Sequence, residues 1–159
     1  MEFKKSNGGK IKIHQKVLNK IEPYLQTQAH MPEAGGILLG RYIIDSEDIV
    51  IDDITEPSEK DIRQRLFYFR SRGFHQRTII RKWTESQGTC NYLGEWHTHP
   101  ESIPTPSLKD VDEWKKALKK FKVDYNYLYF LIAGTCDIQV WEGNKESLEI
   151  NKLDKFGGI

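Results

Sequence analysis

The chain has 159 residues, with 24 Lys and Arg against 23 Asp and Glu and a formal net charge of +1. This length suits one ordinary domain with a substantial core, and the charge balance excludes a polycation built to wrap nucleic acid. No apolar run approaches the ~18 residues of a membrane span, and the polar N-terminal stretch lacks the apolar segment of a signal peptide. Two cysteines exclude a disulfide scaffold. We therefore expect residues 1–159 to form a single cytoplasmic domain with no membrane partner.

The first half of the chain alternates predicted strands and helices. Residues 11–13 predict a short edge strand. The spacing of apolar residues from 14 to 28, in steps of three and four, predicts one helix, which Pro23 inside it would kink. The nearly continuous apolar run over 37–44 is typical of a central strand covered on both faces. A polar turn and a second apolar strand follow, so 37–54 predicts a hairpin.

The second half continues in the same way. Strands are predicted over 66–69, 90–96, 125–133 and 138–142, and helices over 74–86 and 107–120. The apolar stripe of the later helix consists of Leu108, Val111, Trp114, Leu118 and Phe121. Because strands and helices alternate without a strict β-α-β rhythm, we expect an α/β fold with a mixed sheet and helices on its faces.

The residues best suited to chemistry follow the predicted strand 90–96. His97 and His99 lie two positions apart at the end of this strand, so both imidazoles leave the chain on the same side. Two neutral imidazoles on one side are a natural pair of zinc ligands. A chance His-X-His in a surface loop has the same pattern.

Ser107 and Asp110, at the start of the later helix, fit two descriptions. By residue type they form a capping box. The same spacing also places a hydroxyl and a carboxylate side by side in one helical turn. Three prolines restrict the loop that joins this turn to the histidines. His97, His99 and Asp110 would then give three zinc ligands and leave a fourth position for water, the pattern of a catalytic site.

A zinc-bound water needs a general base, and two glutamates compete for this role. Glu33 precedes Gly35 and Gly36 at the mouth of the predicted central strand, where glycines allow a backbone or a ligand to approach closely. Glu95 lies beside the histidines and, in an extended segment, points the same way as His97. The residues alone leave both glutamates open.

These residues resemble the motif of the JAMM (MPN-plus) metalloprotease family. The two histidines, the serine and the aspartate of that motif match His97, His99, Ser107 and Asp110, and its upstream glutamate before a Gly-rich apolar strand matches Glu33. The resemblance spans about residues 33–140. It is strongest to the small bacterial branch, which includes isopeptidases of CBASS antiphage operons and of related operons for ubiquitin-like conjugation.

The resemblance implies a cytidine-deaminase-like (JAMM) α/β fold and a zinc ion held by His97, His99 and Asp110. It implies cleavage after the C-terminal Gly of a ubiquitin-like modifier or of its conjugate to a target lysine. It favours Glu33 as the base, with Ser107 donating to the oxyanion. The implied partners are the modifier or a modified protein such as a cGAS-like nucleotidyltransferase, and E1/E2-like enzymes of the same operon.

Two other classes of protein share part of this pattern. Non-catalytic MPN scaffolds usually lack the zinc ligands, all of which are present here. Cupins require a glutamate where Ile103 and Pro104 stand, and iron oxygenases usually pair His-X-Asp with a distant histidine. Metal analysis would separate zinc from iron.

Residues 61–83 hold seven basic side chains against Asp61 alone. This segment is compatible with a solvated face over a core strand or with a surface that steers an acidic partner. It also has aromatic residues between the basic ones, as in nucleic-acid surfaces, but nucleic acid is not expected as a partner. The remaining histidines, His14, His30 and His75, have no apparent partners in the sequence. Both cysteines are expected in the core or in strands.

Overall fold

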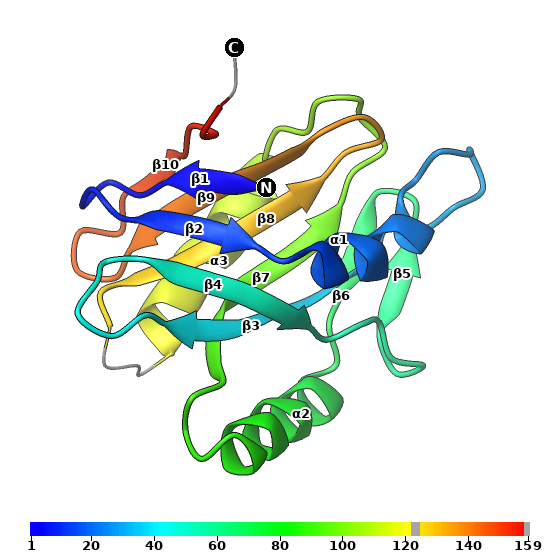
Figure 1. Cartoon of the computed structure of the whole chain (residues 1–159). Coiled ribbons are helices and arrows are strands. Elements are labelled where there is room, and N and C mark those ends of the chain that lie inside the picture. Colours follow the sequence, from blue (N-terminus) through cyan, green and yellow to red (C-terminus); the bar gives the residue numbers. More distant parts are fainter. Residues whose placement is uncertain (122–124, 158–159) are drawn as a thin grey trace.

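The computed structural model describes residues 1–121 and 125–157, which form one eight-stranded sheet, a separate two-stranded hairpin and three α-helices (Figure 1). The strands are β1 (Glu2–Lys4), β2 (Lys10–Ile13), β3 (Gly35–Tyr42), β4 (Ile49–Ile54), β5 (Ile62–Gln64), β6 (Phe67–Phe69), β7 (Asn91–Thr98), β8 (Tyr127–Ala133), β9 (Ile138–Asn144) and β10 (Ile150–Lys152). The helices are α1 (Gln15–Ile21), the short 3-10 helix η1 (Glu22–Tyr24), α2 (Arg72–Glu85) and α3 (Leu108–Lys120). The order in the large sheet is β1-β2-β4-β3-β7-β8-β9-β10, with β5 and β6 paired apart from it.

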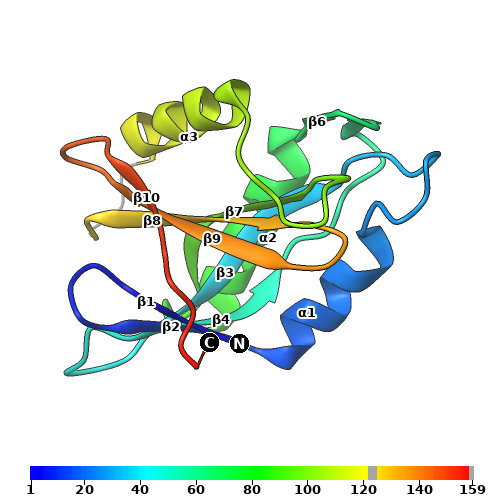
Figure 2. The same ribbon diagram turned by 90° about the horizontal axis from the view of Figure 1, so that it is seen from above.

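Helices cover both faces of the large sheet (Figure 2). Because both faces are covered, successive apolar side chains of strand β8 pack alternately into two cores, one on each face of the sheet. Tyr129 and Leu131 belong to the core on the side of α1, with Val17, whereas Phe130 belongs to the core on the side of α3, with Trp114. The pairs β2–β4 and β7–β8 are parallel and the others antiparallel. The predicted α/β fold with a mixed sheet and helices on its faces is confirmed.

Strand β7 lies inside the sheet, antiparallel to β3 and parallel to β8. Its pairing with β3 places Gly35 opposite His97 and Gly36 opposite Trp96. A Cβ atom on Gly35 would lie 2.6 Å from the carbonyl oxygen of Trp96, so only glycine fits this approach. The start of β3 is thereby held against the end of β7, where the candidate ligands lie.

The hairpin predicted over 37–54 is confirmed by β3 and β4. Two other expectations for the first half were wrong. Strand β2 is not at the edge, because β1 pairs with its outer side. The helix predicted over 14–28 ends as an α-helix at Ile21 and continues only as η1, because Pro23 has no N–H to donate and its ring disfavours a further α-helical turn.

The predicted stripe of α3 is partly wrong. Leu108 is 93% exposed, whereas Ala117 is buried beside Trp114 and Leu118. The short strands β1, β5 and β10 were not predicted, because three-residue strands show too little alternation to be recognised. Cys90 is buried as expected, but Cys136 is exposed. Within the described residues, no helix has both the length and the apolar character needed to cross a lipid bilayer.

Candidate metal centre and active site

Three predicted metal ligands converge where β7 ends and α3 begins. The Nε2 atoms of His97 and His99 lie 3.0 Å apart. The Asp110 oxygens lie 3.4 Å from the first of these nitrogens and 3.1 Å from the second. In a tetrahedron with zinc–nitrogen bonds of about 2.0–2.1 Å, neighbouring ligand atoms lie about 3.3 Å apart. The spacing and the chemistry of this donor set therefore fit a zinc ion.

Glu33 lies two residues before β3, the strand that pairs with β7, and it faces the same cluster. Its side chain is buried, and one carboxylate oxygen lies within 4.8 Å of ligand nitrogens of His97 and His99. Burial raises the pKa of Glu33, against the opposing effect of the two imidazoles. A carboxyl group with a raised pKa beside a metal site can both accept and return a proton near neutral pH.

Ser107 and Asp110 form the predicted capping box of α3. The Asp110 N–H donates to the Ser107 hydroxyl oxygen at 3.1 Å, and the Ser107 N–H donates to the Asp110 carboxylate at 2.8 Å. Burial acts to raise the pKa of Asp110, but hydrogen bonds from His97, His99 and the Ser107 N–H hold it well below its usual range. The cap thus fixes the carboxylate in its charged form against the imidazoles.

Glu101 contacts the cluster and was missed by the sequence analysis. Its carboxylate lies 2.9 Å from Nδ1 of His99, on the ring nitrogen opposite the Asp110 contact. Burial acts to lower the pKa of His99, but the hydrogen bonds to Asp110 and Glu101 raise it to about 9. A carboxylate on the second ring nitrogen is the usual means of orienting a metal-binding histidine. The sequence did offer one signal for this role, because Glu101 is an acidic residue two positions after the candidate ligand His99.

The structure separates the two competing glutamates. Glu95 forms an ion pair with Arg70, with 2.8 Å between Oε1 and Nη2, and both side chains are mostly buried. Glu33, in contrast, lies with the imidazoles. Only one of the two candidates is thus grouped with the predicted ligands.

The basic segment 61–83 does not form one solvated face. Arg63 donates to the carbonyl of Glu33, and Arg65 donates to two carbonyls of the preceding loop. Arg70 pairs with Glu95, and Lys82 lies 3.1 Å from the Asp53 carboxylate. Arg63 and Arg65 therefore hold the loop before β3, Arg70 and Lys82 pair with carboxylates of β7 and β4, and the other three basic residues of the segment are exposed.

His75 has partners that its sequence context did not reveal. Its side chain is 1% exposed, Nδ1 lies 2.7 Å from the Thr55 hydroxyl and Nε2 lies 3.0 Å from Asp61. The Tyr68 hydroxyl lies within hydrogen-bond distance of Asp61 and of the Gly35 carbonyl. This buried network joins α2 to the hairpin β5–β6 and to the start of β3. Its members are too far apart in the sequence to have formed a recognisable motif.

A cavity of about 1070 Å³ opens over the cluster, between α3 on one side and β6 with α2 on the other. At its rim Lys109 lies over the ring of Phe67, with Nζ 3.9 Å from the ring centroid. A cavity of this size accommodates an extended segment of several residues. Its lining includes all five predicted site residues: Glu33, His97, His99, Ser107 and Asp110.

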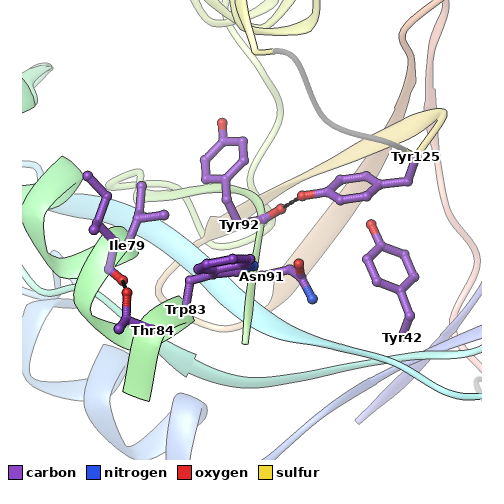
Figure 3. Close-up of a pocket in the computed structure, with 8 residues that line it drawn as sticks. Tyr42, Ile79, Trp83, Thr84, Asn91, Tyr92 and Tyr125 are labelled. Atoms are coloured by element: carbon purple, nitrogen blue, oxygen red, sulfur yellow. Dashed lines mark hydrogen bonds between the residues drawn. The ribbon is translucent and has the colours of Figure 1, made fainter. Parts of the chain in front are cut away.

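A second cavity, of about 840 Å³, lies beside α2 (Figure 3). The side chains that line it are mainly apolar or aromatic: Tyr42, Ile79, Ile80, Trp83, Thr84, Asn91, Tyr92 and Tyr125. The Tyr125 hydroxyl donates to the carbonyl of Tyr92 (Figure 3). The lining contains no carboxylate, imidazole or thiol, so the candidate chemistry belongs to the first cavity.

Residues 15–146 match the family model described as prokaryotic homologues of the JAB domain. The chain belongs to this prokaryotic JAB-domain family. Among its curated relatives is the "CD-NTase/cGAS isopeptidase" of Escherichia coli strain TW11681, 36% identical over 90% of this chain and 86% of the relative. The protein of the same name from Vibrio cholerae is 35% identical over 97% and 94% of the two chains.

Two further likenesses of this JAB-domain protein are more limited. The "Probable metalloprotease y4qB" of Sinorhizobium fredii is 33% identical over 46% of this chain and 44% of the relative. The solution structure of protein DSY2949 from Desulfitobacterium hafniense is 18% identical and superimposes with a TM-score of 0.60, covering 89% of this chain and 88% of that one. This last likeness concerns the fold, which is JAMM-like. Family and relatives together identify the JAB-domain protein as a hydrolase of the metallopeptidase and isopeptidase class that uses a metal cofactor.

Proposed function

We propose that this JAB-domain protein is a zinc isopeptidase that cleaves after the C-terminal Gly of a ubiquitin-like modifier, including the bond that joins the modifier to a target lysine. The observation that carries the proposal is the convergence of two imidazoles and two carboxylates in one large cavity. The cavity has a volume large enough for several residues of a peptide, and the spacing of the donor atoms fits a zinc ion.

In this proposal His97, His99 and Asp110 hold the zinc ion. When bound, zinc supplies Lewis-acid chemistry, since it polarises a carbonyl and lowers the pKa of water from ~15.7 toward ~7. Glu101 orients His99 through Nδ1, at the observed 2.9 Å. The capping box keeps the Asp110 carboxylate directed at both imidazoles.

Glu33 acts as the general base and then as the general acid. Its buried carboxylate accepts the proton of the attacking water and returns it to the leaving amine, a role suited by the raised pKa. Ser107 donates to the oxyanion of the tetrahedral intermediate. Its oxygen already accepts the Asp110 N–H. Since a hydroxyl has one proton and two lone pairs, its proton stays available for the substrate oxygen.

The proposed substrate follows from the names of the relatives. Because two relatives that match nearly the whole chain are called CD-NTase/cGAS isopeptidases, we take a conjugate of a cGAS-like nucleotidyltransferase as the substrate. E1/E2-like enzymes would form the conjugate, and the JAB-domain protein would reverse the reaction in antiphage defence of the CBASS type.

The proposal also includes a single domain that acts in the cytoplasm. Strands β1 and β10 belong to the same sheet, and Phe3 bridges to Lys155, which supports one domain over the described residues. Both cysteines are free thiols, as is usual in a reducing compartment.

The test is cleavage of a defined isopeptide conjugate. A cGAS-like nucleotidyltransferase that carries a ubiquitin-like modifier, joined through the modifier's C-terminal Gly to a lysine side chain, is incubated with the zinc-loaded protein, and the products are identified by mass spectrometry. We expect release of the intact C-terminal Gly, loss of activity with a chelator and recovery with zinc. A zinc-loaded protein that leaves this conjugate and conjugates of ubiquitin-like modifiers uncut would overturn the proposal.

A further inference from the structure

Gln26 is a buried amide whose polar atoms are all engaged. It follows η1 and is 2% exposed. Its Nε2 donates to the carbonyl of Met31 at 3.2 Å and to the carbonyl of Arg65 at 2.7 Å. Its Oε1 accepts from the hydroxyl of Thr98 at 2.9 Å. Two carbonyl acceptors on one side and a hydroxyl donor on the other fix the orientation of the amide.

Thr98 is the residue between the two candidate histidine ligands, and it is fully buried. Its hydroxyl accepts the N–H of Ala34 at 3.0 Å. The single hydroxyl proton is therefore free to bond Gln26. The Thr98 N–H also donates to the Ala34 carbonyl at 2.9 Å. Ala34 directly follows Glu33, so these bonds connect the strand of the metal ligands to the segment of the proposed base.

The other two contacts of Gln26 are backbone carbonyls of the two segments that adjoin Glu33. Met31 belongs to the loop that enters Glu33, and Arg65 belongs to the turn between β5 and β6. The residues just before Arg65 hold the backbone of Glu33: the Glu33 N–H donates to the Gln64 carbonyl at 2.6 Å, and Arg63 donates to the Glu33 carbonyl at 3.0 Å. Gln26 thus touches each of the three segments that meet around Glu33.

We propose that Gln26 is a positioning residue of the active site, which holds the carboxylate of Glu33 at its working distance from the metal ligands. This inference rests on the proposed function, in which Glu33 is the base. Residues 25–34 have no strand or α-helix of their own, so the contacts of Gln26 substitute for regular structure there. A displacement of about 1 Å in a catalytic group can cost up to ~100-fold in rate.

The test compares Gln26→Met in two backgrounds, wild type and Glu33→Gln. The substitution keeps the side-chain length and removes the three hydrogen bonds. With zinc-loaded protein and the isopeptide conjugate, we expect kcat to fall about 10- to 100-fold in the wild-type background, with KM changed less than about twofold. In the Glu33→Gln background we expect no further loss, since the residue acts through Glu33. Zinc content should equal that of the wild type.

A second measurement does not depend on activity. Hydrogen exchange should become faster at residues 31–36 and 62–66 in Gln26→Met, while β8 and β9 stay protected. Gln139→Met is the matched control, because Gln139 is also buried but lies on β9, two strands away from β7, and donates to Asp137 and not to a segment around Glu33. It should change neither kcat nor exchange around Glu33. If Gln26→Met does not fold, Gln26→Glu retains the acceptor for Thr98 and should lower kcat in the same way.

Three outcomes would overturn the inference. A lowered melting temperature with unchanged kcat would make Gln26 a purely structural residue. An equal fractional loss in both backgrounds would mean that it does not act through Glu33. Full activity of Glu33→Gln alone would instead refute the proposed function, and the inference would fail with it; this result is distinct from the other two.

Discussion

Glu95 and Arg70 form an ion pair in which both side chains are mostly buried, with 17% and 20% of their surface exposed. Burial acts to lower the pKa of Arg70, but the Glu95 carboxylate, together with Tyr92 and Tyr68, raises it above its ordinary value, so this guanidinium stays charged. The negative charge of Glu95, two residues before His97, is thus neutralised by Arg70. Removing either partner would leave a charge buried without compensation, which is costly. The pair is therefore expected to serve stability, and Glu33 is left to serve chemistry.

The first prediction concerns the base. Glu33→Gln keeps the shape of the side chain and removes its affinity for protons. We expect unchanged zinc content, a melting temperature near that of the wild type and a fall in kcat of about 10²–10⁴-fold. The variant should bind conjugates and retain them, as measured by co-purification of uncleaved conjugate.

Glu95→Gln is the matched control for this experiment. It should lower the melting temperature, because Arg70 loses its partner, and reduce kcat far less than Glu33→Gln. A fully active Glu33→Gln together with an inactive Glu95→Gln would reverse the assignment of the base.

The second prediction concerns the ligands. His97→Ala and His99→Ala should each lose zinc, because the two remaining ligands cannot hold the ion well. The core on both faces of the sheet does not depend on these side chains, so circular dichroism should show a folded protein. Inductively coupled plasma mass spectrometry measures the metal, and full zinc occupancy in both variants would refute the ligand assignment.

Ser107 carries the third prediction, because it has two roles. Loss of the oxyanion donor predicts a fall in kcat of about 100-fold for Ser107→Ala. Loss of the N-cap predicts a decrease of about 1 kcal/mol in the free energy of unfolding. Ser71→Ala is the matched control, because Ser71 is the N-cap residue of α2 and its side chain makes no capping bond. A less stable Ser107→Ala with wild-type kcat would show that Ser107 is only a cap.

The fourth prediction concerns pH. The pKa of His99 is raised to about 9 in the metal-free protein, above the ~6.5 of an unfolded chain. Its contribution to stability is then complete below about pH 6.5 and is lost as the pH rises to about 9. Zinc must displace this proton. Its apparent affinity should therefore rise up to tenfold per pH unit through this range, with proton release measurable by calorimetry in buffers of different ionisation enthalpy.

Glu101→Gln is the control for the pH experiment. It retains an acceptor for Nδ1 of His99 but removes a negative charge that helps to raise the pKa. The pH range of proton release should move to lower values. An unchanged range in this variant would contradict the assignment of the released proton to His99.

The sequence was most informative where local spacing decides the structure. The motif from His97 to Asp110 lies on one strand end, one loop and one helical turn, so its spacing predicted which side chains converge. The hairpin over 37–54 followed from two apolar runs around a polar turn. These features depend on residues that are close in the chain.

Features that depend on distant residues were not predictable in this way. Gln26 forms a hydrogen bond with Thr98, and His75 forms one with Thr55. The spacing of apolar residues along the chain gives no indication of either contact. Arg63, Arg65 and Arg70 looked like free surface charge, because a sequence does not show the carbonyls and the carboxylate that they bind. Only the packing of the loops around β7 brings these groups together.

The position of β7 in the sheet determines how early, during synthesis of the chain, the site can form. Its two neighbours in the sheet, β3 and β8, come from segments before α2 and after α3, respectively. A chain still being synthesised cannot complete this pairing until β8 has left the ribosome, and such non-local pairing forms slowly compared with helices. The three strands that frame the metal ligands can therefore come together only when translation of the domain is nearly finished.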